Sequence, residues 1–201
     1  MRQSQQQVAT MIFRLFRRNP QAATIAALYG AIVAQARNPS FYLGFGVPDT
    51  AEGRFDMILL HLALFCRRLG HDPATVGSLG QDVFDMFCRD MDHNLREMGV
   101  GDLSVPKKMQ KMAEAFYGRL EIYDRALAAI GDDDLAGALA RNVLGEAAPS
   151  GSARRLAAYA RAAARRLDET PVAALTGAAL RFPDPDTMPA LARGEAPHHD
   201  R

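Results

Sequence analysis

The side chains best suited to metal chemistry are two histidines and the carboxylates near one of them. His93 and Glu97 are four residues apart, which places both on one face of a helix, and His61, Asp90 and Asp92 are further candidate ligands. Zinc sites usually carry tighter signatures such as HExxH or paired cysteines, and the sequence contains neither. We therefore expect no metal or other cofactor, and a metal-dependent enzyme stays as an alternative.

The sequence gives less support for a catalytic nucleophile or a nucleotide-binding loop than for a metal site. Cys66 and Cys88 each lie within an apolar helical pattern, which favours buried free thiols over a disulfide or a reactive thiolate. No Gly-x-Ser-x-Gly elbow occurs, and residues 99–102 (GVGD) are typical of a tight turn because no strand precedes them. The sequence favours a non-enzymatic protein.

Charged residues favour recognition of a partner. Four of them alternate in sign along one predicted helix face: Asp85, Arg89, Asp92 and Arg96. This ladder is either solvated or the rim of a binding groove. Lys107, Lys108 and Lys111 are the only lysines in the chain and lie at the start of one predicted helix, where positive charge opposes the helix dipole. An acidic partner, or the nearby Asp102 and Glu114, would offset that penalty.

The elements that position these residues are predicted to be helices, because Gly, Pro and Asn punctuate helical patterns and no run alternates as a strand does. The expected helices cover about residues 5–18, 20–37, 50–69, 79–98, 106–130, 132–144, 152–168 and 171–180. This pattern predicts an all-α protein with a single compact domain of about six to eight helices. No apolar run is long enough to span a bilayer, which favours a soluble protein.

The best-defined helix is the one over residues 50–69. Its apolar residues recur at helical spacing and predict one buried stripe: Phe55, Ile58, Leu59, Leu62, Phe65, Cys66 and Leu69. Asp49 and Glu52 have the spacing of a capping box at its start. Residues 38–50 are predicted to form a loop whose apolar side chains, including Phe41 and Tyr42, need cover from the core or from a partner.

The two ends of the chain differ from the middle. No acidic residue precedes Asp49, so the first 48 residues carry a charge of +5 (5 basic minus 0 acidic) and the rest −4 (19 basic minus 23 acidic). Residues 1–19 are predicted to form a basic amphipathic helix with a candidate membrane-binding surface made of Arg14, Phe16, Arg17 and Arg18. A helical domain is expected over 20–182 and a disordered tail over 183–201.

Three long strings carry a family resemblance: LYGAIVAQARNPSFY (Leu28–Tyr42), GVPDTAEGRFDMILLHLAL (Gly46–Leu64) and MDHNLREMGVGDLSVPKKMQKMAEAFYGRLEIY (Met91–Tyr123). They resemble the ubiquinol-cytochrome c chaperone family, the bacterial relatives of a mitochondrial assembly factor for the cytochrome bc1 complex. The resemblance spans about residues 25–145. It implies an all-helical, non-enzymatic assembly chaperone that binds newly made cytochrome b or another bc1 subunit, with a small helper protein and the ribosome as further partners.

The matching positions are the expected partner contacts, although a structural role is equally open for them. They are Val47, Pro48, Asp49, Thr50, Arg54, Asp92, Arg96, Glu97, Asp102, Lys107, Lys108 and Arg119, with Phe41 and Tyr42 added from the apolar loop. The surface between the second and third strings is the expected place for an apolar client segment.

Composition bears on location. Arg outnumbers Lys 21 to 3 and Ala is abundant, a bias typical of GC-rich bacterial genomes. We expect a protein of the bacterial cytoplasm, located at the inner face of the membrane if its basic helix binds lipid. The alternative function is therefore a peripheral membrane-binding helical adaptor. No motif predicts specific nucleic-acid recognition.

Overall fold

Helix α4 (Ala51–Gly70) runs through the centre of the protein. In the computed structural model, which describes residues 20–70 and 78–189, nine consecutive α4 residues from Met57 to Phe65 are buried. A helix that is apolar on nearly every side packs within the core rather than at the surface. The predicted one-sided stripe is therefore too narrow, because Leu60, His61 and Leu64 are buried as well.

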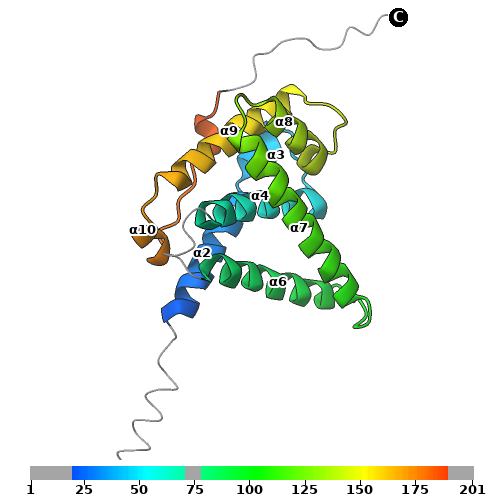
Figure 1. Cartoon of the computed structure of the whole chain (residues 1–201). Coiled ribbons are helices and arrows are strands. Elements are labelled where there is room, and N and C mark those ends of the chain that lie inside the picture. The colour runs from blue at the N-terminus through cyan, green and yellow to red at the C-terminus, as the bar shows by residue number, and fades with distance from the viewer. Residues whose placement is uncertain (1–19, 71–77, 190–201) are drawn as a thin grey trace, which may run out of the picture.

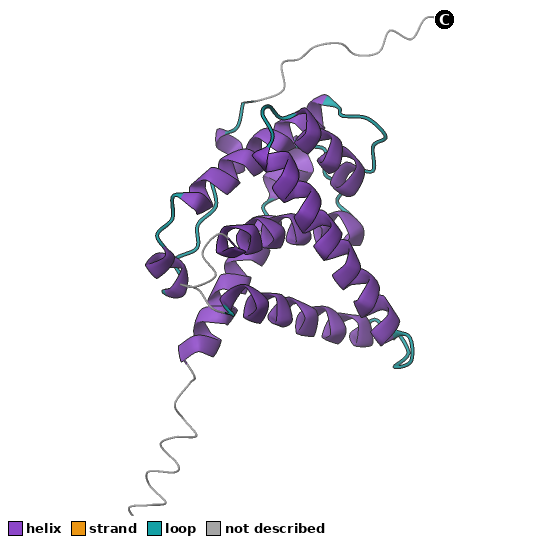
Figure 2. Cartoon of the chain, viewed as in Figure 1, coloured by secondary structure: helices purple, strands orange, loops and turns teal. Residues whose placement is uncertain are grey.

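The other helices surround α4 (Figure 1). α2 (Pro20–Ala36), α6 (Leu79–Glu97), α7 (Val105–Ala128) and α9 (Gly151–Asp168) all pack directly against it, and α8 (Asp133–Leu139) packs on α7 and α9. Figure 2 shows helices joined by loops, without a strand, in the described part of the chain. The prediction of a single all-α domain is confirmed. Among the described residues, no helix is both long and apolar enough to cross a membrane.

The start of α4 differs from the predicted capping box. The N-cap is Thr50, whose Oγ1 accepts a hydrogen bond from the Gly53 amide at 3.1 Å. Asp49 instead pairs with Arg54 at 2.7 Å, so its carboxylate does not cap the helix. Glu52 is then one residue too early to close a capping box with Thr50. Gly53 is needed here because a Cβ atom would lie 2.1 Å from the Pro48 carbonyl oxygen.

The predicted loop over residues 38–50 contains a short helix, α3 (Pro39–Gly44). Asn38 Oδ1 accepts a hydrogen bond from the Ser40 amide at 3.0 Å, and Pro39 occupies the first turn, where its missing N–H costs nothing. The helix turns Phe41 fully into the core. The loop prediction is therefore wrong for residues 39–44, because Asn-Pro acts here as a helix start.

The second half of the chain closes the core from the other side. The predicted helix over 132–144 is observed as α8 followed by a turn of π-helix, η1 (Ala140–Leu144), which ends at Gly145 with φ of 68°. Arg161 on α9 donates to the Leu127 carbonyl at 3.0 Å and pairs with Asp132, so it fastens α9 to the turn before α8. Predicted bounds of the helices at 20–37, 79–98 and 152–168 each agree with the observed ends to within one residue.

The carboxy-terminal residues that the structure describes pack against the domain. After α10 (Val172–Thr176), the chain returns along α3, where η2 (Pro185–Thr187) buries Pro185. Gln35 Nε2 donates to the Pro183 carbonyl at 3.0 Å, and Met188 packs against the core. The predicted disordered tail is therefore wrong for residues 183–189, because proline-rich chain can still bury apolar surface. Residues 190–201 lie outside the described part.

Candidate partner-binding surface

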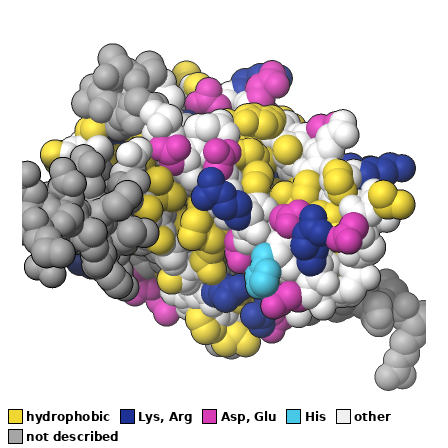
Figure 3. Space-filling view, turned by 90° about the horizontal axis from the view of Figure 1, so that it is seen from below, with side chains coloured by type: hydrophobic (Ala, Val, Ile, Leu, Met, Phe, Trp, Pro, Cys, Tyr) yellow, Lys and Arg dark blue, Asp and Glu magenta, His cyan; other side chains and the backbone are white. Residues whose placement is uncertain are grey.

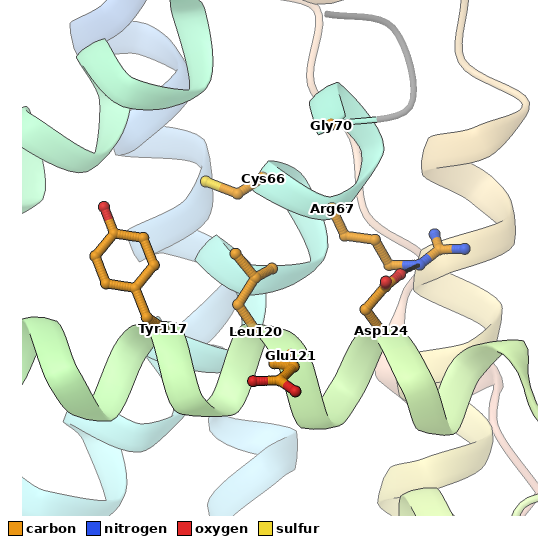
Figure 4. A pocket seen from close by; sticks show the side chains of 7 residues that line it. All are labelled: Cys66, Arg67, Gly70, Tyr117, Leu120, Glu121 and Asp124. Carbon is orange, nitrogen blue, oxygen red and sulfur yellow. Dashed lines mark ion pairs between the residues drawn. The ribbon is translucent and has the colours of Figure 1, made fainter.

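An open pocket of about 340 Å³ lies between α4 and α7. Cys66, Arg67 and Gly70 of α4 form one wall, and the other wall comes from α7: Tyr117, Leu120, Glu121 and Asp124. Figure 4 shows the Tyr117 and Leu120 side chains rising from α7 toward the Cys66 side of α4. Both helices overlap the two strings whose shared surface was expected to bind a client, and the pocket residues of α4 lie just past Leu64, where the second string ends.

The apolar side of the pocket is held by aromatic packing. The Tyr117 ring lies 5.5 Å from the Phe84 ring and 5.3 Å from the Phe116 ring, centroid to centroid. Phe84 and Phe116 are themselves stacked at 4.6 Å and are buried, so they form a rigid base. Tyr117 is nevertheless 51% exposed. A large apolar ring is therefore fixed in place and still accessible, which is typical of an anchor point for a partner.

The other side of the pocket is charged. Arg67 lies between two carboxylates, 3.2 Å from Asp124 and 3.1 Å from Asp168, and Glu121 pairs with Arg125 at 2.6 Å. Three carboxylates thus face two guanidinium groups, which leaves an excess of one negative charge at this rim. Positive groups on a partner are favoured there.

The pocket thiol is not set up for nucleophilic chemistry. Burial raises the pKa of the Cys66 thiol to about 12, so it is protonated at neutral pH. Its only polar contact in the described residues is a weak one, 3.9 Å from Sγ to the Gly80 carbonyl. Cys66 and Cys88 are both free and half-buried, and burial also raises the pKa of Cys88. The prediction of free thiols inside helices is confirmed, whereas their predicted full burial is not, because both side chains remain partly exposed.

Of the contact residues predicted around α3 and the start of α4, some are buried in the structure and others are exposed. Phe41 and Val47 are 0% and 2% exposed, so their assignment as partner contacts is wrong: they fill the core. Tyr42 is half-buried and its hydroxyl donates to the Ala36 carbonyl at 2.7 Å. Four predicted contact residues remain accessible at the start of α4, at the opposite end of this helix from the pocket: Pro48, Asp49, Thr50 and Arg54.

The sites predicted around the α6–α7 turn form a surface network. Arg96 pairs with Asp92 at 2.7 Å and also with Asp102, and the hydrogen bond from Arg96 lowers the pKa of Asp92. Glu97 lies 3.1 Å from His93. Lys107 and Lys108 are exposed and make no ion pair with any described residue. These side chains are accessible to a partner.

The expected alternating ladder on α6 forms only in part. Arg89 was expected to lie beside Asp85 in this ladder. The Asp85 carboxylate instead accepts a hydrogen bond from Gln81 Nε2 at 2.7 Å. Figure 3 shows that the face seen from below carries hydrophobic side chains in patches, with acidic and basic side chains interspersed. Neither sign of charge dominates that face, so it has no single-sign field to steer a charged partner.

Arg119 has a structural role instead of the predicted contact role. Its guanidinium lies 2.7 Å from Asp56 on α4 and donates to the Asn142 carbonyl in η1 at 3.2 Å. Both side chains of the ion pair are less than one fifth exposed. Burial raises the pKa of Asp56, and Arg119 acts against that shift. Arg119 therefore holds α4, α7 and η1 together, and a partner has little access to it.

The candidate metal ligands are dispersed. His61 is fully buried: Nδ1–H donates to the Met57 carbonyl at 2.8 Å, and Nε2 accepts from the Tyr159 hydroxyl at 2.8 Å. Asp90 accepts a hydrogen bond from the Tyr29 hydroxyl on α2 at 2.7 Å. No group of three His, Cys, Asp or Glu side chains within residues 20–70 and 78–189 could hold a metal ion.

The predicted membrane-binding surface lies outside the described residues. It consists of Arg14, Phe16, Arg17 and Arg18.

Sequence reasoning missed the pocket residues Cys66, Tyr117 and Leu120 as a site. Cys66 was assigned to the buried stripe over residues 50–69 and is half-buried, so that interpretation is close to the structure. The available signal was Tyr117, which directly follows Phe116 and lies beside the apolar face of α7 that includes the buried Phe116 and Tyr123. A large aromatic at the border of a stripe indicates that the apolar face extends further than the core needs.

The family model described as ubiquinol-cytochrome C chaperone matches residues 43–182. Among solved structures, the chain is similar to the crystal structure of the Cbp3 homolog from Brucella abortus, at 38% sequence identity and a TM-score of 0.78, covering 89% of this chain and 99% of that one. No curated protein matches the chain. The family match includes α4, α7 and every residue that lines the pocket.

Proposed function

The chain belongs to the ubiquinol-cytochrome C chaperone family, and on this premise we propose that it shields a newly made segment of cytochrome b in the α4–α7 pocket during cytochrome bc1 assembly. Family membership and the likeness to the Cbp3 homolog support the general role of a bc1 assembly chaperone. Membership of a chaperone family also implies a role without catalysis. The client and the binding surface are our specific proposal.

The observation that supports this client is the combination of an apolar wall and a carboxylate rim in one open pocket. Tyr117 and Leu120 offer apolar surface, while Glu121 and Asp124 lie beside them on the next turn of α7. Membrane-spanning helices are rich in large apolar residues, and Lys and Arg flank their cytoplasmic ends. Such a segment has the two kinds of side chain that this pocket complements.

The energies are compatible with transient holding. Burying one large apolar side chain contributes about 1.5 to 3 kcal/mol, and each 1.4 kcal/mol changes an affinity about tenfold. A pocket of this size accepts few such side chains, so the client can be released when its partner subunits arrive.

Cytochrome b is made at the cytoplasmic membrane, so in this proposal the protein works at the inner face of that membrane. A small helper protein and the ribosome stay predictions from the resemblance.

The test uses two substitutions on α7 with comparable starting exposure. Tyr117→Glu adds a charge to the apolar wall, whereas Ile122→Glu adds the same charge at a residue that is 40% exposed and outside the pocket. We expect Tyr117→Glu to reduce cytochrome b recovered with the tagged protein by about tenfold or more. Ile122→Glu should leave it unchanged. Thermal unfolding of both variants checks that the fold is retained.

A photocrosslinking amino acid at position 117 gives an independent reading in living cells. Crosslinks from position 117 to cytochrome b, with none from position 122, would support the pocket as the client site. Normal bc1 content and haem b absorbance in cells that carry only the Tyr117→Glu protein would contradict it. If the deletion strain also kept normal bc1 content, cytochrome b would be the wrong client.

A further inference from the structure

The turn between α6 and α7 exposes two large apolar side chains. We refer to residues 98–104 as the hairpin tip. Met98 is 71% and Leu103 98% exposed, and Figure 1 shows this turn at an outer corner of the molecule, at the far end of both helices. Single exposed apolar residues are ordinary on protein surfaces, so exposure alone does not indicate a binding site. The backbone hydrogen bonds of the turn and the charges beside it are the further evidence.

The backbone of the hairpin tip is fixed by hydrogen bonds. The Val100 amide donates to the Leu95 carbonyl at 3.0 Å and the Gly99 amide to the Arg96 carbonyl at 2.9 Å, with Gly99 at φ of 78°. This is the Schellman pattern, which ends a helix in one defined direction. Arg96 adds its pairs with Asp92 and Asp102 across the turn. The tip therefore holds Met98 and Leu103 outward instead of allowing them to fold back.

Positively charged side chains lie beside the hairpin tip. All three lysines of the chain, Lys107, Lys108 and Lys111, are on the first two turns of α7 and are exposed without an ion pair to a described residue. Residues 92–114 contain four basic side chains and four carboxylates, and the carboxylates have partners: Arg96 for Asp92 and Asp102, His93 for Glu97, and Gln110 for Glu114. The lysines are thus the charges left available for an external anion.

We propose that the hairpin tip binds an anionic lipid surface, with Leu103 and Met98 entering the interface and the three lysines at the headgroups. Apolar side chains next to basic ones are what such surfaces bind, and lysine stems extend along apolar surface while the ammonium reaches anions. A protruding turn suits a flat lipid surface better than it suits a peptide, which needs a groove. RNA is disfavoured because residues 98–111 contain no aromatic residue or arginine for base stacking.

This surface is separate from the predicted basic segment at the amino end. Gln21, at the start of α2, donates to Asp82, near the start of α6, so residues 1–19 join the domain at the opposite end of α6 from the tip. A helix of 19 residues is about 28 Å long. The proposal also stands apart from the cytochrome b pocket and does not depend on it. A local reporter can therefore distinguish the tip from the other candidate surfaces.

The chain contains no tryptophan, so one introduced tryptophan reports on one place. The test compares Leu103→Trp with Ile130→Trp, a residue past the other end of α7 that is fully exposed as well. Each full-length protein is mixed with vesicles of phosphatidylglycerol and phosphatidylcholine, with pure phosphatidylcholine vesicles, and with polyuridine. We expect the emission of Trp at position 103 to shift to the blue, and to be quenched by brominated acyl chains, on the anionic vesicles only.

The lysines give the second variant. Replacing Lys107, Lys108 and Lys111 together by Gln in the Leu103→Trp protein should weaken that response by about tenfold or more, because each lysine near an anionic surface contributes to binding. Thermal unfolding verifies the fold of each protein. Flotation of the protein with vesicles while Trp at 103 stays unchanged would overturn the proposal and assign lipid binding elsewhere. Equal quenching at 103 and 130, no lipid response at all, or a response to polyuridine alone would overturn it too.

Discussion

Helix α4 and the α6–α7 hairpin carry similar apolar residues and use them in opposite ways. From Met57 to Phe65 every side chain of α4 is buried, so its sequence is constrained on all sides by neighbouring helices. The hairpin buries one face, with Val83, Phe84 and Phe87, and leaves Met98 and Leu103 in solvent. The difference indicates that stability resides in α4, while the hairpin and the adjoining pocket wall are available for recognition.

The sharpest form of this comparison is one substitution made twice. Leu62→Ala removes a fully buried side chain from α4 and should lower the free energy of unfolding by about 2 to 5 kcal/mol. Leu103→Ala makes the same chemical change at the hairpin tip, where we expect less than about 0.5 kcal/mol. Chemical denaturation measures both. Similar losses for the two variants would break the division between a structural helix and a recognition hairpin.

Acid should act on α4 through His61. Burial lowers the pKa of His61 to about 4, from 6.5 when the chain is unfolded, so protons bind preferentially to the unfolded chain between these values. Stability is therefore unaffected by this group above about pH 6.5 and falls as the pH drops toward 4, by on the order of 3 kcal/mol.

The measurement is the free energy of unfolding across that range for the natural protein and for His61→Gln. Carboxylates also titrate near pH 4, so the difference between the two proteins isolates His61. We expect the variant to be less stable at neutral pH and to have a flatter pH dependence. Parallel curves would show that the imidazole is not held neutral by the core.

The smallest effect concerns the start of α4. Thr50→Ala removes the hydroxyl that accepts from the Gly53 amide and should cost about 1 kcal/mol. Asp49→Ala removes only an exposed pair with Arg54, for which we expect between about 0 and 1 kcal/mol, below the effect of Thr50→Ala. Thermal or chemical unfolding of the two variants measures this. A larger loss for Asp49→Ala would restore Asp49 as the cap.

Periodicity was enough to predict most helices, because α6, α7 and α9 each show one polar and one apolar face. It underestimated α4, since a helix enclosed by others has no polar face to mark its boundary. The sequence places the cap one residue early because Asp49 and Thr50 are both good capping residues; in the structure Asp49 pairs with Arg54 and Thr50 accepts from the Gly53 amide. Local patterns do not reveal which of the two side chains caps the helix.

The site was less accessible to sequence reasoning than the fold. The sequence left open whether the core or a partner covers Phe41 and Val47, and it named both as expected partner contacts; α3 and the turn after it direct them into the core. The pocket joins Cys66 with Tyr117, residues on different helices, and its walls exist only after α4 and α7 have packed. The resemblance predicted a client surface between the second and third strings, which stays a prediction, and it named none of the residues that line the pocket.

The hydrogen bonds around Gln35 affect when the protein can finish folding during its synthesis. Gln35 Nε2 donates both to the Tyr159 hydroxyl and to the Pro183 carbonyl, which joins positions 148 residues apart in the chain. During translation α2 emerges early and must wait for these late partners, so the interior around His61 stays incomplete until residues as far as Pro183 have been made. A chain cut short before Pro183 would leave that interior open.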